Sequence, residues 1–179
     1  MKQLIRDAVI AALLLLSGSL APTALADSED LRAEAEKAIK VLQSTDSSLT
    51  NRFRSSAGFV VFPSIGKGGL FFGGEYGKGL VYDHGKPIGE ATLSEVNVGP
   101  QVGGQSFYEV IFFETDEALA DFKQSKSELS AKTSAVLSTE GAALDATYRD
   151  GVMIFTLPRN GLMAQAAVGG QKFKYKPLN

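Results

Sequence analysis

Apolar residues follow two different periods along the chain, and the change of period separates a helical start from a β-rich remainder. Residues 28–43 carry apolar side chains at every third or fourth position, the spacing of one helix face: Leu31, Ala35, Ala38 and Leu42. Residues 47–56 predict a shorter second helix, with Leu49 and Phe53 inward and Arg52 and Arg54 outward. These two helices occupy residues 27–56 of the predicted domain.

From residue 57 onward the pattern indicates strands. β-Branched and aromatic runs are typical of strands, and here they include Phe59–Phe62, Leu70–Tyr76 and Gly79–Tyr82. Gly151–Leu157 and Leu162–Val168 are further predicted strands, on either side of a hairpin loop. We expect Pro63 to stop the first run. Residues 108–113 (YEVIFF) are almost entirely apolar, which predicts a strand covered on both faces.

Turn and capping residues punctuate these strands. Asp83-His84-Gly85-Lys86 and Pro158–Gly161 have the composition of hairpin loops. Thr115 followed by Asp116 and Glu117 predicts the start of one helix inserted among the strands. Residues 128–140 alternate with period two, as a strand does. At the end of the chain, Lys172, Lys174 and Lys176 fall on one strand face.

The elements together predict the α+β class in a single domain, residues 27–179, of which 57–179 are mostly β. Paired glycines recur near residues 73, 103 and 169, and such positions let a strand bend or approach another backbone. We therefore expect a curved antiparallel sheet, or a partly closed barrel or sandwich, with N-terminal helices and one inserted helix.

Residues 1–26 have the order of a secretory signal peptide. Lys2 and Arg6 precede a short apolar run, and Ala24-Leu25-Ala26 offers small residues before Asp27. The apolar run is too short to span a bilayer. We expect cleavage near Ala26 and a protein exported to the periplasm, the cell envelope or the extracellular space.

The composition of the chain limits the kinds of site and activity that the protein can have. The chain has no Cys, which excludes thiol catalysis and cysteine zinc sites, and its net charge of −2 argues against a nucleic-acid partner. No nucleophile elbow or phosphate-binding loop occurs. The sole histidine, His84, lies in a predicted turn, and an enzyme would require it to cluster with two or more carboxylates in a concave pocket. We expect no catalytic residues, no metal and no cofactor.

Two charged groups leave alternatives open. Glu114, Asp116 and Glu117 are able to hold a divalent cation, but stabilisation of the following helix by its first-turn acids is the favoured interpretation. The lysines of residues 172–176 suit either an anionic ligand or protection of an exposed sheet edge.

From Ala57 onward the chain resembles the SYLF domain family, over about two thirds of its length. The matching residues run in order: Val61-Phe62-Pro63, Lys67, Gly69, Gly73-Gly74, Tyr76-Gly77, Gly79, Val98-Gly99, Gln101, Gly103, Gln105-Ser106, Val110–Phe113 and Gly161–Gly169. The resemblance implies helices packed on a curved antiparallel sheet and a non-enzymatic role at membranes. Lipid binding in eukaryotic members is attributed to basic residues and an amphipathic N-terminal segment. Yeast members are also described as actin-binding, a property not expected of an exported chain.

The leading functional hypothesis is therefore an exported, non-catalytic module that binds lipid or another anionic amphiphile at a membrane surface. Five residues are the candidate contacts, the first three for head groups and the last two for apolar chains: Arg52, Arg54, Lys67, Phe71 and Phe72. The alternative is a structural module of the envelope that binds a protein partner by strand addition at residues 172–176.

Overall fold

The structure of the chain is a computed structural model that describes residues 22–69, 72–98, 105–124, 134–136, 141, 143–144, 146–159 and 171–178. The chain divides into two compact units, Met1–Asp30 and Leu31–Asn179. Only residues 22–30 of the first unit are described, and they are helical. None of the described helices is long and apolar enough to cross a membrane.

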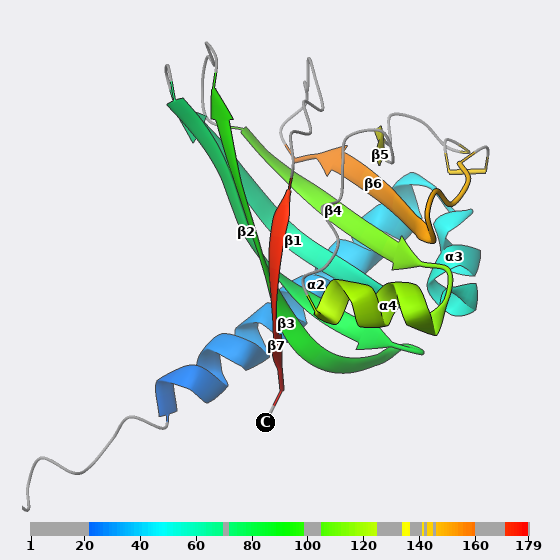
Figure 1. Ribbon diagram of the computed structural model, residues 1–179, viewed down its shortest axis with the longest axis horizontal. Coiled ribbons are helices and arrows are strands. Elements are labelled where there is room, and N and C mark those ends of the chain that lie inside the picture. Colours follow the sequence, from blue (N-terminus) through cyan, green and yellow to red (C-terminus); the bar gives the residue numbers. More distant parts are fainter. Residues whose placement is uncertain are drawn as a thin grey trace, which may run out of the picture. The chain divides into compact units, whose positions relative to one another are not determined.

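Three helices and seven strands make up the described part of the chain (Figure 1). In chain order they are α2 (Pro22–Thr45), α3 (Leu49–Ser55), β1 (Gly58–Gly69), β2 (Phe72–Asp83), β3 (Lys86–Val98), β4 (Gln105–Phe113), α4 (Asp116–Lys123), β5 (Ser134–Val136), β6 (Val152–Pro158) and β7 (Lys172–Pro177). Both N-terminal helices and the inserted helix are confirmed, although α2 begins six residues before the predicted start.

The strands form one sheet in the order β5-β6-β4-β1-β2-β3-β7. All described pairs are antiparallel except the short parallel pair of β5 and β6. The sheet is strongly curved. The rings of Phe62 on β1 and Phe173 on β7 lie 5.9 Å apart, although two strands, β2 and β3, lie between β1 and β7 in the sheet. A flat sheet would place those strands about 14 Å apart. The α+β class and the curved sheet are confirmed, and the sheet is open rather than a closed barrel.

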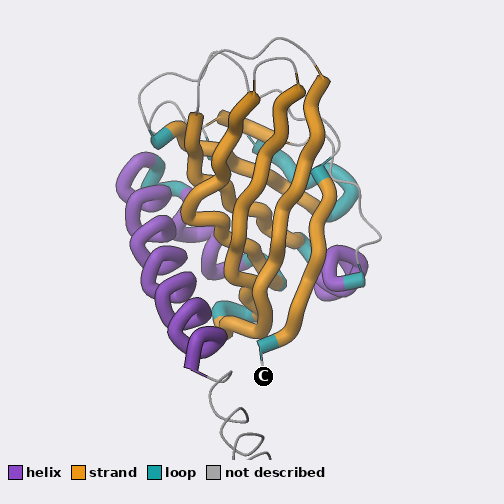
Figure 2. The backbone as a smooth tube through the Cα atoms, turned by 90° about the vertical axis from the view of Figure 1, so that its left-hand side faces the viewer, coloured by secondary structure: helices purple, strands orange, loops and turns teal. Residues whose placement is uncertain are grey.

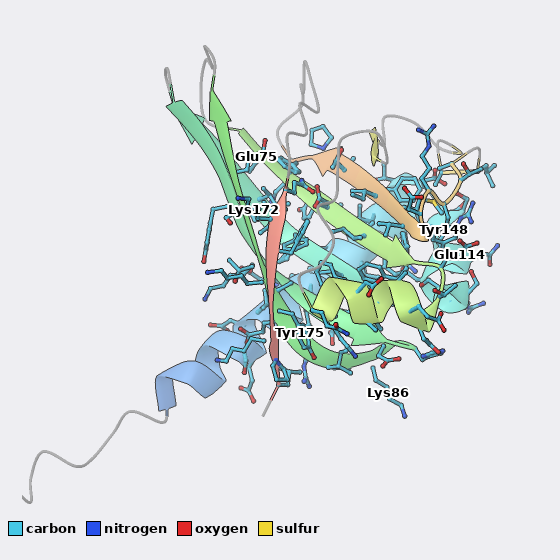
Figure 3. All side chains as sticks on the ribbon, viewed as in Figure 1. Glu75, Lys86, Glu114, Tyr148, Lys172 and Tyr175 are labelled. Atoms are coloured by element: carbon cyan, nitrogen blue, oxygen red, sulfur yellow. The ribbon has the colours of Figure 1, made fainter. Side chains whose placement is uncertain are left out.

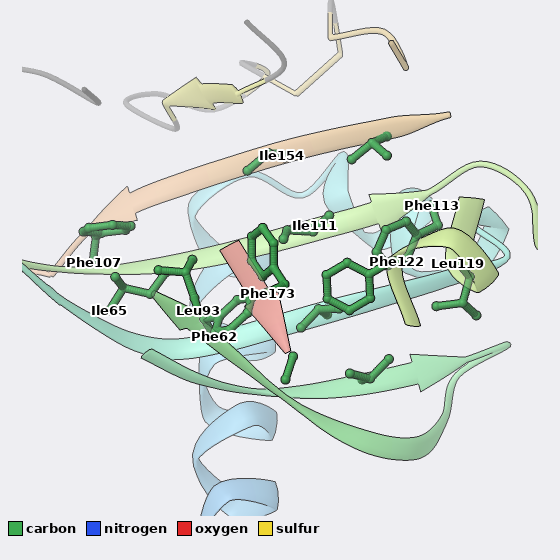
Figure 4. Close-up of a cluster of buried hydrophobic side chains, with 14 residues drawn as sticks. Phe62, Ile65, Leu93, Phe107, Ile111, Phe113, Leu119, Phe122, Ile154 and Phe173 are labelled. Carbon is green, nitrogen blue, oxygen red and sulfur yellow. The ribbon is translucent and has the colours of Figure 1, made fainter. Parts of the chain in front are cut away.

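Each face of the sheet covers its own apolar core. The concave face and α4 enclose Phe62, Phe113, Phe122 and Phe173 with their neighbours (Figure 4). The convex face is covered by α2, from Leu31 onward, and by α3. The buried side chains of the two helices pack against aromatic and aliphatic residues of the sheet: Ala35, Ala38 and Leu42 of α2 and Leu49 of α3 against Phe59, Val110, Phe112 and Phe155. Strand β4 contributes alternate residues to both cores, which confirms the strand predicted to be covered on both faces.

Pro63 does not end the first strand, contrary to the prediction. β1 continues from Gly58 to Gly69, and its pairing with both neighbours shifts register around Pro63, between Val61 and Ser64 against β2 and between Phe62 and Ile65 against β4. A bulge at this point tolerates the missing backbone donor of proline and bends the strand. Because of this bend, one long strand replaces the expected short one.

Other predicted elements are confirmed in part. The two runs expected between residues 70 and 82 form the single strand β2, and the 83–86 turn and the Thr115 cap are present. Only Ser134–Val136 of the predicted 128–140 strand is described. The predicted strand at residues 162–168 and the tip of its hairpin loop lie outside the described residues.

The turn between α2 and α3 is held by a buried carboxylate. Asp46 accepts hydrogen bonds from the Ser48 amide (3.0 Å), the Ser48 hydroxyl (2.6 Å) and the Ala143 amide (2.7 Å). Burial alone would raise the pKa of Asp46, but these hydrogen bonds outweigh it and hold the pKa below its ordinary value. The carboxylate therefore binds the helix junction to the segment before β6.

We expect Asp46→Asn to lower the free energy of unfolding by about 2–3 kcal/mol at pH 7, because at least one backbone or hydroxyl donor loses a charged acceptor. Since the folded-state pKa is depressed, this contribution is present above the unfolded pKa and is lost as pH falls through the folded value. Urea unfolding at pH 7 and below pH 3 measures it. Equal losses at both pH values would contradict the account, and the exposed Asp121→Asn serves as control.

Candidate functional site

The convex side of strands β2, β3 and β7 presents a lysine-rich surface, which we call the basic face. Alternation places Phe173 of β7 in the concave core, so Lys172, Lys174 and Lys176 point to the opposite side, where all three are exposed. The same argument places Thr92 of β3 on that side, because Ala91 and Leu93 are in the core. The predicted clustering of the three lysines on one face is confirmed.

Strand register aligns these residues in rows. Tyr76 pairs with Ser94, which pairs with Lys172. In the next row Lys78 pairs with Thr92, which pairs with Lys174. In the third, Glu90 of β3 pairs with Lys176. Directly paired side chains lie about 5 Å apart on one face, so the basic face combines four lysines with one acid, Glu90, and one aromatic ring, Tyr76, which is 57% exposed.

The basic face is open to its surroundings within the described residues of the Leu31–Asn179 unit. Figure 2 shows the strands of this side uncovered, with helices only at its margins. Figure 3 labels Lys172 at the start of β7. An extended, cationic sheet surface with one aromatic ring suits an anionic surface better than a small molecule enclosed in a pocket.

β7 is anchored firmly enough to hold its lysines in place. Phe173 lies in the concave core against Phe62 and Phe122, with ring centroids 5.9 and 5.3 Å away. The Tyr175 hydroxyl donates a hydrogen bond to the Ile88 carbonyl (3.1 Å). The Tyr175 ring also lies against Gly89, where any added side chain would collide with it. The spacing of the lysines is therefore set by a paired strand rather than by a loose terminus.

The concave core holds a small buried polar cluster opposite the basic face. Glu109 of β4 is fully buried, pairs in register with Thr156 of β6, and accepts a hydrogen bond from the Gln171 side chain (3.2 Å). Gln171 immediately precedes β7, so this bond reaches across the curve of the sheet. Among the described residues, the Thr156 hydroxyl and the Gln171 side-chain oxygen have no hydrogen-bond partner. The cluster helps to fix the position at which β7 begins.

The described parts of the residues predicted as lipid contacts lie on different elements: Arg52 and Arg54 on α3, the backbone of Lys67 on β1 and the backbone of Phe72 on β2. Arg52 of α3 donates a hydrogen bond to the Ala146 carbonyl (3.0 Å), and its guanidinium lies 5.9 Å from the centre of the Tyr148 ring. It therefore has a structural role, binding α3 to the segment before β6. Arg54, on the same helix, is exposed.

Lys67 lies far from those two arginines. Lys67 is nine residues along β1 from Gly58, and Gly58 is at the end of the strand next to α3. Nine residues of an extended strand span about 30 Å. In register Lys67 lies opposite Glu75 of β2 and Gln105 of β4. Phe71 is outside the described residues, and of Phe72 only the backbone is described.

A second charged group lies at the C-terminal end of β2, around the turn to β3. His84 and Gly85 have positive φ angles of 46° and 78° and form the tight turn to β3. The Nδ1 atom of His84 lies 2.7 Å from an Asp83 carboxylate oxygen, and its Nε2 atom lies 3.9 Å from a carboxylate oxygen of Asp116 on α4. The hydrogen bond with Asp83 raises the pKa of His84. All of these groups are near the surface, with the His84 side chain 65% exposed.

The acids after β4 divide between two roles. Thr115 caps α4 by accepting a hydrogen bond from the Ala118 amide (3.3 Å), and Asp116 and Glu117 occupy the first helical turn, as predicted. The helix backbone and Thr115 lower the pKa of Glu117. Asp116 in addition faces His84, which the sequence did not indicate.

Sequence reasoning missed Lys78 and Tyr76 as members of the basic face. Both lie on one face of β2, between glycines whose positions contact the concave core: an added Cβ at Gly77 would meet Ile65, and one at Gly79 would meet Phe62. The alternation Tyr76-Gly77-Lys78-Gly79 was the available signal. It does not reveal which strand pairs with β7, and that pairing creates the face.

Comparisons with known proteins do not assign this chain to a family. A scan against protein-family models gives no match. A search of curated proteins also gives no match.

Proposed function

We propose that the protein is a non-catalytic module that binds anionic lipid, or another anionic amphiphile, at a membrane surface. The observation that supports this proposal is the basic face, on which Lys78 of β2 lies on the same side of the sheet as Lys172, Lys174 and Lys176 of β7. One acid, Glu90, is on the strand between them, β3. Tyr76 adds an exposed aromatic ring of the kind that settles at the head-group level of a bilayer.

The strength of this binding follows from the number of lysines. A basic residue close to an anionic bilayer contributes about 1 kcal/mol, so four give an interaction of about 4 kcal/mol before Glu90 is taken into account. Binding of this strength is reversible and requires many charged lipids. It needs no pocket for a single head group, and it acts through the charge of the surface.

The resemblance to the SYLF family supports the same function independently, since lipid binding is attributed to basic residues in that family. The predicted signal peptide would bring the protein to the outer side of a membrane after cleavage near Ala26. For this chain we place the head-group contacts chiefly on β2 and β7, with Arg54 as a further exposed cation on α3. Lys67, Phe71 and Phe72 remain candidate contacts proposed from the sequence.

We expect the protein to co-sediment with vesicles that contain anionic phospholipid and not with vesicles of neutral phospholipid. Raising the salt from about 0.01 M to about 1 M should release it, because the screening length falls from about 30 Å to about 3 Å. Binding that is equal on both vesicle types, or unaffected by salt, would contradict recognition by the lysines. If residues 1–26 are a cleaved signal, a protein made without them should bind the same vesicles with the same dependence on salt.

A second candidate function is the binding of a protein partner at the outer edge of β7. This strand ends the sheet, and in the described structure it pairs only with β3. An extended peptide could add there as an eighth strand, although lysines along an edge disfavour such association. Recovery of one stoichiometric protein partner, without vesicle binding, would favour this function over lipid binding.

A further inference from the structure

The turn between β2 and β3 and the start of α4 bring together Asp83, His84 and Asp116. One ligand atom from each lies within 4.8 Å of the others. Asp116 is 32 residues from His84 in the sequence, and the fold alone places them side by side. None of the three residues belongs to the basic face, so the group requires an explanation separate from the proposed lipid binding.

The backbone holds the histidine in place on a rigid support. The His84 amide donates a hydrogen bond to the Ala57 carbonyl just before β1 (2.9 Å). The turn itself is a tight two-residue connection with both φ angles positive. Asp116 is the first residue of α4, and Thr115 caps that helix. The ligand atoms are therefore carried by a hairpin and a helix that both belong to the folded unit.

The two ring nitrogens of His84 have different surroundings. With Nδ1 protonated, His84 donates a hydrogen bond to Asp83 (2.7 Å), the arrangement in which a carboxylate orients a metal-binding imidazole. Nε2 then carries a lone pair on the side of Asp116, whose carboxylate oxygen is 3.9 Å away. Two ligands on one zinc ion at about 2.0–2.1 Å lie about 3.3 Å apart. The exposed Asp116 side chain reaches that separation by a small rotation.

We propose that this group is a surface site for a divalent transition-metal ion such as Zn²⁺. His84 Nε2 and the Asp116 carboxylate bind the ion, Asp83 orients the imidazole, and water completes the coordination. Imidazole with carboxylate oxygens is a ligand set that suits zinc and its neighbours rather than calcium or magnesium. Because the site is open to solvent, it binds the ion reversibly and leaves coordination positions for a group from outside.

The test uses Zn²⁺ itself and the full chain without an affinity tag. Since His84 is the only histidine, a single pair of imidazole nitrogen resonances reports the site in long-range ¹H–¹⁵N NMR spectra. We expect Zn²⁺ to shift the Nε2 resonance while Nδ1 stays protonated. Calorimetric titration of the same sample gives the affinity. Imidazole resonances that do not move with Zn²⁺ would overturn the proposal.

Variants separate this site from general attraction of cations to acids. We expect His84→Asn and Asp116→Asn to weaken Zn²⁺ binding at least about tenfold, and Asp83→Asn to weaken it by about tenfold, the usual effect of losing a carboxylate that orients a ligand. Glu117→Gln is the matched control, because Glu117 is adjacent on α4 and absent from the group; its affinity should be unchanged. Equal affinity of the His84→Asn variant and the unaltered chain would overturn the proposal.

Discussion

Phe112→Ala is expected to lower the free energy of unfolding by about 3–5 kcal/mol, the cost of truncating a fully buried phenylalanine. Phe112 is completely buried on the convex side of β4. Its ring lies 4.9 Å from Phe53 of α3, 6.1 Å from Phe59 of β1 and 6.0 Å from Phe155 of β6. One truncation therefore loosens the contact of a helix with three strands.

Urea unfolding measures this loss, and Leu144→Ala is the matched control. Leu144 is 68% exposed, so its truncation should change the stability by less than about 0.5 kcal/mol. Comparable effects of the two substitutions would show that α3 does not pack on β4 as described.

The local pattern of the sequence predicted most of the elements for physical reasons. The 3–4 spacing from Leu31 to Leu42 reflects one buried helix face, and all four apolar residues of that stripe are in the core. The continuous apolar run at residues 108–113 reflects a strand between two cores. These predictions succeeded because burial of each residue depends on its own element.

Predictions that depended on distant partners were less successful. Pro63 was expected to end a strand, but both neighbouring strands of β1 shift register and accommodate it. His84 was interpreted as a turn residue, which is correct, yet its approach to Asp116 depends on how α4 packs. The sequence did not indicate that Arg52 donates a hydrogen bond to the Ala146 carbonyl, 94 residues away, and its contact with lipid stays a prediction. No short-range pattern contains this information.

Reversing three charges on β7 is the second large expected effect. In a variant with Lys172, Lys174 and Lys176 all changed to Glu, the attraction of three lysines, about 3 kcal/mol, is lost and replaced by repulsion. We expect affinity for anionic vesicles to fall at least about 100-fold. The side chains are exposed and leave Phe173 and Tyr175 in place, so the fold should persist, which circular dichroism can check.

A matched control carries the same change of net charge elsewhere. Lys86, Lys40 and Arg149 are exposed and lie outside the basic face, and Figure 3 shows Lys86 far from Lys172. With these three residues changed to Glu, only the general repulsion between protein and membrane increases.

The decisive measurement is co-sedimentation of the unaltered chain and the two triple variants with the same anionic vesicles at low salt. The account predicts that the β7 variant stays in the supernatant while the control variant sediments with most of its affinity. Equal losses in the two variants, or retention of binding by the β7 variant, would contradict the assignment of lipid binding to the basic face.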